Sequence, residues 1–158
     1  MRPSGMSLLA DPAGGYVYEA AYGNGTVVGF AIDATTGRIA AIGGSGSVPA
    51  GQNPYSVAMD RAGKFLYVAN FTSNDVSGYR VNPATGVLTS VGAASPVVSS
   101  CYAVTVDPSG KFLYAVNAGD QSISSFSIDA MTGVLTSTGP TVPTGVGPLT
   151  IITADPTP

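Results

Sequence analysis

The sequence predicts an all-β chain of three tandem four-stranded antiparallel repeats, followed by the first strand of a fourth. Three observations lead to this prediction. Short stretches rich in Val, Ile, Tyr, Phe and Thr alternate with turns, which 21 Gly and 12 Pro among 158 residues make frequent. No segment of helical length has helical periodicity. Two turn motifs recur in step along the chain, which indicates structural repeats.

The first recurring motif is a turn that begins with Asp and contains Gly. Its Asp residues are 49, 47 and 48 positions apart, at Asp11, Asp60, Asp107 and Asp155. A Thr-Gly pair keeps the same step, at 36–37, 85–86 and 132–133. Residues 60–92 align with 107–139 without a gap and share 15 of 33 positions. We therefore expect one domain with repeats at 6–54, 55–101 and 102–148, and an unpaired strand at 149–155.

Each repeat divides into four predicted strands. The first strand leads into the Asp turn and is expected at Met6–Ala10, Tyr55–Met59, Tyr102–Val106 and, in the fourth repeat, Leu149–Thr153. The second is expected at Tyr16–Tyr22, Phe65–Phe71 and Phe112–Ala118, and the third at Thr26–Ile32, Val76–Val81 and Ser122–Ile128. The fourth begins at Arg38, Val87 and Val134. Longer Pro- and Gly-rich connections, such as Ser47–Pro54, lead to the next repeat.

The turns have the residues that tight antiparallel hairpins need. Between the first two strands, Asp precedes a Gly that is expected to take a positive φ, which fits a type I turn with a Gly bulge. Between the third and fourth strands the turn also ends on Gly. There Asp33, Asn82 and Asp129 are expected to accept hydrogen bonds from turn amides.

Four-stranded antiparallel repeats of about 40–50 residues are typical of β-propeller blades. A β-solenoid would have shorter coils, and an immunoglobulin-like sandwich would not repeat in sequence. We therefore predict propeller blades.

The repeat consensus is Asp-Pro-Ser-Gly-Lys-Phe-Leu-Tyr-x-x-Asn followed by Thr-Gly-x-Leu-Thr. Residues 64–70 with 85–89, and 111–117 with 132–136, match it. This consensus resembles the lactonase family of seven-bladed propellers, which includes 6-phosphogluconolactonase-type enzymes and overlaps the YVTN-repeat surface proteins. The resemblance implies a closed ring of seven blades, of which this chain would supply fewer than half. It also implies His, Arg and Glu around a central channel, but this sequence has no His and one Glu. No catalytic residue is therefore carried over.

Three blades leave apolar faces at both ends of an arc, because each blade packs on two neighbours. Three explanations stay open. The chain is a piece of a longer protein and packs on its remaining blades. Alternatively, two copies form a homo-oligomer that closes a six-bladed ring and exchanges the unpaired strand. In the third explanation, the arc of blades caps another protein or polymerises through its free edges.

Composition excludes several classes of function. The net charge is −3 and the six cations are scattered, so we expect no nucleic-acid binding. The sequence has no run of 18 apolar residues, so we expect no membrane span. The apolar stretch within residues 1–9 is too short for a signal peptide. The low charge with abundant Ser, Thr and Gly favours an extracellular, periplasmic or cell-surface location, with the cytoplasm still open. Cys101 is the single cysteine, so no intrachain disulfide can form, and we expect it to be a small buried residue.

Few polar residues are left for a site once the turns are accounted for. Asp75 and Asp120 lie in loops between second and third strands, where they could bind Ca²⁺ or a sugar hydroxyl or simply be solvated. Asn70 and Asn117 end second strands, where they could face a ligand or cap the loop backbone. Arg80, in a third strand, could hold a phosphate or carboxylate or face solvent. No metal site and no cofactor is predicted.

These residues favour a non-catalytic propeller module for assembly or ligand binding. They argue against an enzyme whose catalytic groups all come from this chain. The family resemblance supports an alternative, a lactonase-type hydrolase of the 6-phosphogluconolactonase kind. A carbohydrate-binding propeller with a small sugar-like ligand is a third hypothesis.

Overall fold

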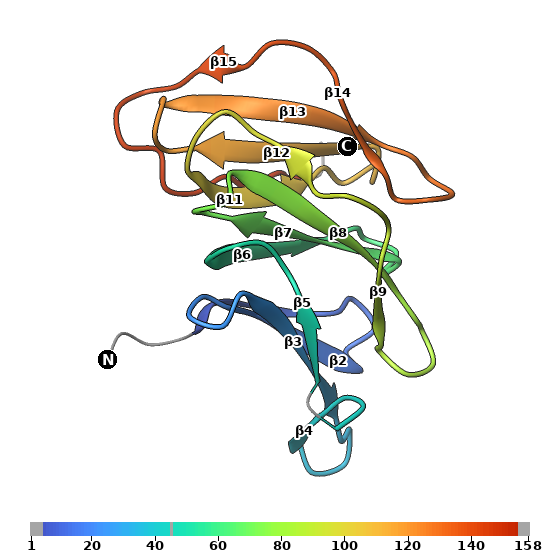
Figure 1. The fold of residues 1–158 in the computed structure, drawn as a ribbon. Helices are drawn as coiled ribbons and strands as arrows, with labels where there is room; N and C mark the ends of the chain where they lie inside the picture. The colour runs from blue at the N-terminus through green and yellow to red at the C-terminus, as the bar shows by residue number, and fades with distance from the viewer. Residues whose placement is uncertain (1–4, 45, 155–158) are drawn as a thin grey trace.

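The computed structural model describes residues 5–44 and 46–154, with side chains from residue 7 on. The described residues form fifteen β-strands and no helix. The strands make three separate antiparallel sheets, one for each repeat, which are stacked in chain order (Figure 1). We call these sheets blade 1 (β1–β5), blade 2 (β6–β10) and blade 3 (β11–β15). The all-β fold and the propeller-like blades are therefore confirmed.

Each blade follows the same order, with three long strands and then two short ones. Blade 1 has β1 (Gly5–Ala10), β2 (Tyr16–Ala21), β3 (Thr26–Ile32), β4 (Ile39–Ala41) and β5 (Ser47–Pro49). Blade 2 has β6 (Pro54–Met59), β7 (Phe65–Asn70), β8 (Asp75–Val81), β9 (Leu88–Ser90) and β10 (Ser95–Pro96). Blade 3 has β11 (Cys101–Val106), β12 (Phe112–Asn117), β13 (Ser122–Ile128), β14 (Leu135–Ser137) and β15 (Val142–Pro143). The three long strands of each blade lie within a residue of their predicted bounds.

The fourth strand differs from the prediction. In every blade it is broken into two short pieces that both pair with the third strand, as β4 and β5 do with β3. A glycine with a positive φ lies in each break, at Gly43, Gly92 and Gly139. The region expected to be only a connection, Ser47–Pro54, therefore begins with a strand.

The predicted turn chemistry is confirmed. Asp60 Oδ1 accepts hydrogen bonds of 2.7 Å from the amides of both Lys64 and Phe65, and Gly63, which precedes Lys64, has a φ of 68°. In the turn between third and fourth strands, Asp129 Oδ1 accepts from the amides of Met131 and Thr132. These carboxylates therefore hold hairpins closed.

The two faces of β7, the second strand of the middle blade, pack against different blades. Phe65 and Tyr67 of β7 lie in a buried cluster with Leu113 of blade 3, whereas Leu66 on the opposite face lies in a cluster with Tyr18 of blade 1. The first strands of neighbouring blades also lie side by side, β1 against β6 and β6 against β11. The core is therefore made between blades, and the first strands form the inner edge of the arc.

No strand forms over the expected unpaired strand, of which residue 155 lies outside the described residues. A strand needs a ladder partner, and this segment has no second strand beside it. Thr153 nevertheless donates a hydrogen bond of 2.8 Å to the carbonyl of Val106, so the segment lies beside β11. Among the described residues there is also no helix long and apolar enough to cross a membrane.

Candidate functional site

The first strands of blades 2 and 3 each carry a β-bulge near their start. The pairing of β6 with β7 shifts between Pro54 and Ser56, so Tyr55 is the extra residue. The pairing of β11 with β12 shifts in the same way around Tyr102. Bulges redirect side chains and are frequent beside functional sites. Here they place the two tyrosines against each other across the boundary between blades.

The bulged tyrosines are the centre of an aromatic cluster. Their ring centroids are 4.1 Å apart and their hydroxyl oxygens 2.5 Å apart. Phe71 meets Tyr102 edge-on at 5.8 Å, and Tyr22 meets Tyr55 edge-on at 6.1 Å. Edge-to-face geometry at these distances is favourable for aromatic rings. We call Tyr22, Tyr55, Phe71 and Tyr102 the inner-edge aromatic cluster.

The cluster lies at one end of the blades, on the inner edge of the arc. Tyr55 and Tyr102 belong to the innermost strands, and Tyr22 and Phe71 directly follow β2 and β7. All four residues are half-buried, so the cluster is partly open to solvent. A group of accessible rings with a few hydroxyls is the composition of a small-molecule site.

The two central hydroxyls share one hydrogen bond, and either can donate. This bond, with burial and the neighbouring Tyr102 and Tyr22, raises the pKa of Tyr55 to about 12. Near neutral pH Tyr55 is therefore a neutral donor or acceptor, which suits binding of hydroxyl and carbonyl groups and not removal of a proton.

The structure buries Asn70 and Asn117 completely. Asn70 Nδ2 donates to Asp75 Oδ1 at 2.6 Å and to the hydroxyl of Ser77 at 2.8 Å. Asn117 Nδ2 donates to the hydroxyls of two serines of β13. The Oδ1 atom of each asparagine is buried without a partner among the described residues, and a bound water could fill that role. Their geometry is that of clamps between second and third strands, and their contact with a ligand stays a prediction.

The two predicted loop carboxylates differ in exposure. Asp75 is half-buried and held by Asn70, while Asp120 is exposed and accepts from the Ser122 hydroxyl at 2.9 Å. Asp75 is the first residue of β8 and so does not lie in the loop where it was expected, because it pairs with Asn70 at the end of the β7–β8 ladder. Asp120 lies in the loop before β13 of blade 3, as expected, so the two carboxylates belong to different blades. A role for them in ligand binding also stays a prediction.

Arg80 lies apart from the other candidates. In the β7–β8 ladder Asn70 faces Asp75 at one end, and Phe65 faces Arg80 at the other. The guanidinium lies 5.0 Å from the centre of the Phe65 ring and donates to the carbonyl of Met131 in blade 3. Arg80 thus joins two blades, and the sequence-predicted residues do not form a single site.

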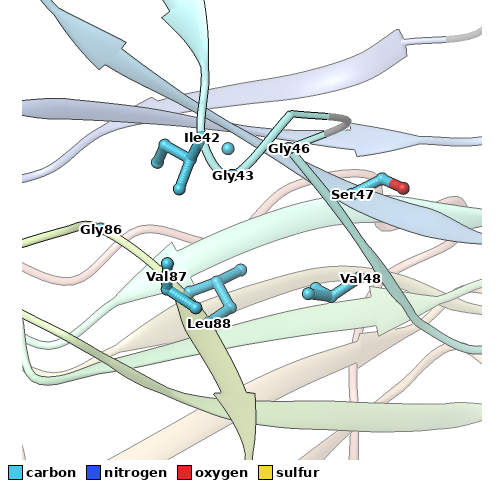
Figure 2. A pocket seen from close by; sticks show the side chains of 9 residues that line it. Ile42, Gly43, Gly46, Ser47, Val48, Gly86, Val87 and Leu88 are labelled. Atoms are coloured by element: carbon cyan, nitrogen blue, oxygen red, sulfur yellow. The ribbon is translucent and has the colours of Figure 1, made fainter.

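The described residues also form a cavity of about 150 Å³ between blades 1 and 2. Figure 2 shows the apolar side chains of Ile42, Val48, Val87 and Leu88 around it. With glycines and few polar groups in its lining, this cavity has no set of groups for acid–base chemistry.

Neither a metal centre nor a reactive cysteine is formed by the described residues. Within residues 5–44 and 46–154, no three His, Cys, Asp or Glu side chains gather into a group that could hold a metal ion. Cys101 is fully buried, as predicted, and burial together with the charge of Asp75 raises the pKa of its thiol to about 12. A thiol in this state is a poor nucleophile.

The inner-edge aromatic cluster was missed by the sequence analysis, although a signal was present. Tyr55 and Tyr102 occupy the same position in two successive repeats, at the head of a predicted strand. What the sequence could not show is the bulge that turns these residues toward each other.

Comparisons with known structures agree with the fold. A protein from Bacteroides fragilis, provisionally described as a 6-phosphogluconolactonase, superposes with a TM-score of 0.84 at 24% identity, over 94% of this chain and 41% of its own. The periplasmic gluconolactonase of Pseudomonas aeruginosa superposes at 0.78 with 23% identity, over 92% of this chain and 41% of its own. A protein from Lactobacillus plantarum gives 0.81 with 20% identity, over 95% of this chain and 45% of its own. This chain thus spans less than half the length of these proteins.

No curated protein sequence matches the chain. A family model does, and it is described as the lactonase, a seven-bladed β-propeller. It covers residues 5–105, which are 101 of the 158 residues and include blades 1 and 2. The chain belongs to the lactonase family of seven-bladed β-propellers.

Proposed function

We propose that this chain is the ligand-binding sector of a lactonase-type propeller that acts on a sugar lactone or the related sugar acid. The observation that carries the proposal is the inner-edge aromatic cluster, whose rings and paired hydroxyls lie on the edge that faces the axis in a closed ring. Membership of the lactonase family supports the class of ligand.

The cluster has the two features that a sugar-like ring requires. The C–H face of a sugar ring can stack on Phe71 or Tyr22, which are half-buried, since aromatic faces carry negative charge and bury large apolar areas. The hydroxyls of Tyr55 and Tyr102 can donate to a lactone carbonyl or a ring hydroxyl. These are neutral contacts, so we assign binding and orientation to the cluster and leave activation of water to groups supplied by other blades.

The experiment is a titration with D-glucono-1,5-lactone and, separately, with gluconate. The chain has eight tyrosines and no Trp, so its fluorescence comes from tyrosine, and three of the eight belong to the cluster. We expect a saturable change that Tyr102→Phe weakens about fivefold, because one hydrogen bond is worth roughly 1 kcal/mol. Tyr16→Phe is the matched control, since Tyr16 is also half-buried but lies at the opposite end of β2 from Tyr22.

A titration without saturation would contradict the proposal, as would equal weakening by both variants. Acid release from the lactone, followed at constant pH, separates binding from hydrolysis. Saturable binding without acid release above the uncatalysed rate would support the second candidate, a non-catalytic carbohydrate-binding propeller. The paired hydroxyls of Tyr55 and Tyr102, whose geometry suits hydrogen bonding to a sugar, favour this candidate.

An exported location goes with this proposal. The low content of charged residues, 9% of the chain, is the observation that favours it. Fractionation of the source cells with an antibody against the chain would test the location.

A further inference from the structure

The backbone places Tyr55 and Tyr102 by matching features of two neighbouring blades. Each tyrosine is the extra residue of a bulge, and two positions before it lies a residue other than glycine with a positive φ, Asn53 at 54° and Ser100 at 48°. Such conformations are costly and persist where the surrounding structure fixes them. The side chain of Asn74 in blade 2 also accepts a hydrogen bond of 2.5 Å from the amide of Ser100, which ties the two blades together beside the pair. The two rings are therefore held in a fixed relative position.

The rings of this pair converge at their hydroxyl ends. The hydroxyl oxygens are 2.5 Å apart, which is closer than the ring centroids at 4.1 Å, and the ring planes are tilted by 43°. In a tyrosine ring the ortho carbons are bonded to the carbon that carries the hydroxyl. The ortho carbons of Tyr55 and Tyr102 therefore lie in the converging part of the pair. These carbons share the unpaired electron when a phenol loses one electron and one proton.

No other two tyrosines among the described residues are arranged in this way. Tyr22 meets Tyr55 edge-on, at 6.1 Å and 82°, so the edge of one ring points at the face of the other. The three buried tyrosines each donate a hydrogen bond to a backbone carbonyl: Tyr18 to Gly86, Tyr67 to Gly133 and Tyr79 to Pro49. Within residues 5–44 and 46–154, neither Tyr16 nor Tyr114 stacks on another tyrosine ring.

We propose that Tyr55 and Tyr102 are an oxidation site, at which a haem peroxidase joins the two rings into a dityrosine. Each phenol gives one electron to the peroxidase and one proton to water, which leaves two phenoxyl radicals. The radicals form a carbon–carbon bond between ortho carbons, and the hydrogen on each of these carbons then moves to the oxygen and restores the phenol. One hydrogen peroxide takes up the two electrons and two protons and becomes two molecules of water, so the chain loses two hydrogen atoms.

The fold favours this coupling over other outcomes of oxidation. Two groups that are already held in contact react much faster than groups that must meet by diffusion. The cluster is also partly open to solvent, so water can accept the protons. The new bond would join β6 of blade 2 to β11 of blade 3, between residues that are 47 positions apart. A link that closes a long loop lowers the entropy of the unfolded chain and so stabilises the folded one.

The experiment treats the chain with hydrogen peroxide and a haem peroxidase at several chain concentrations. Trypsin cleaves after Lys and Arg, so Tyr55 is the only tyrosine of peptide 39–61 and Tyr102 the only one of peptide 81–111. We expect the product to keep the mass of a single chain less two hydrogen atoms, and to link these two peptides with a yield independent of chain concentration. The urea midpoint of the linked chain should be higher than that of the untreated chain.

Two controls identify the pair and the role of the fold. Tyr102→Phe should lose the linked peptides, whereas Tyr22→Phe should keep them, because Tyr22 belongs to the same cluster but meets Tyr55 edge-on. Oxidation of the chain in urea should lose the preference for these two peptides. The proposal would be overturned by the absence of a link in the folded chain, by links that join mainly other peptides or separate chains, or by equal yields with and without urea.

D-Glucono-1,5-lactone separates the oxidation site from the proposed function. The crosslink does not rest on the proposed function, but protection by the lactone does. Lactone bound to the hydroxyls of Tyr55 and Tyr102 should slow the link. A link that forms equally fast with and without the lactone would support the oxidation site and contradict lactone binding at the inner-edge aromatic cluster.

Discussion

The hydroxyl oxygens of Tyr55 and Tyr102, from the first strands of neighbouring blades, lie 2.5 Å apart. This hydrogen bond is the largest of the causes that raise the pKa of Tyr55 to about 12, ahead of burial. Tyr102→Phe removes the bond, so the pKa of Tyr55 should fall toward the ordinary value of about 10. Absorbance titration of the tyrosines measures this shift. Tyr22→Phe is the control, because it leaves the bond in place, and an equal shift in both variants would contradict the assignment.

The raised pKa of Tyr55 makes the stability of the folded chain depend on pH in the alkaline range. A tyrosine whose pKa is raised on folding favours its neutral form in the native state, so its contribution is complete below about pH 10 and is lost as the pH rises through about 12. Burial also raises the pKa of Tyr18 and of Tyr67. We therefore expect the chain to unfold in alkali, with both of these tyrosines ionising only as it unfolds.

The glycine that packs on Tyr16 should tolerate no side chain. Gly86→Ala combines a strained positive φ, which costs about 1–2 kcal/mol, with overpacking of about 1–3 kcal/mol. Gly14→Ala has the first cost and not the second. Urea unfolding should give Gly86→Ala a lower free energy of unfolding than Gly14→Ala, by the cost of overpacking of about 1–3 kcal/mol. Equal free energies of unfolding would show that the blades can shift apart to accept the methyl group.

Acid should weaken the turns between third and fourth strands. Hydrogen bonds lower the pKa of Asp129: its carboxylate accepts them from the amide and the hydroxyl of Thr132 and from the amide of Met131. The charged form is thus favoured in the folded state, and its contribution is present above about pH 4 and lost as the pH falls through the lowered pKa. Asp129→Asn should make the thermal midpoint less dependent on pH below about pH 4.

The equivalent turn of blade 2 provides the converse experiment. Asn82 accepts a hydrogen bond of 2.9 Å from the amide of Ala84 without carrying a titrating group. Asn therefore suits this turn, and Asn82→Asp should add the pH dependence that Asp129→Asn removes. If neither variant changed the slope of midpoint against pH, the turn carboxylates would not be the source of acid sensitivity.

The elements that the sequence predicted well are those that local chemistry decides. The Asp turn at Asp60 and the strand Phe65–Asn70 depend on residues next to them in the chain. The strand β5 was missed because it exists only through pairing with β3, beyond a break at glycine. The site depends on register in the same way. Only the ladder of β7 with β8 separates Arg80 from Asn70, and only the bulges bring Tyr55 to Tyr102.

The buried asparagine of blade 2 should matter more for stability than for binding. Asn70→Ala would leave Asp75 and Ser77 without their shared donor, which costs about 1–3 kcal/mol for a buried group. Blade 1 has Ala21 at this position, so the backbone accepts alanine. Urea unfolding measures the loss, and the lactone titration of the folded variant checks binding. An unchanged free energy of unfolding with lost binding would instead make Asn70 a ligand-binding residue.

Cys101 should react with thiol reagents only when the chain opens. Its side chain is fully buried, and burial followed by the charge of Asp75 raises its pKa to about 12. Because the thiolate is the reactive form, labelling at neutral pH should be slow in the native protein and should accelerate in urea along with unfolding. The free energy obtained from the labelling rate should then equal that from urea unfolding. Fast labelling without urea would mean that β11 separates from its neighbours on its own, which its place between blade 2 and the core of blade 3 argues against.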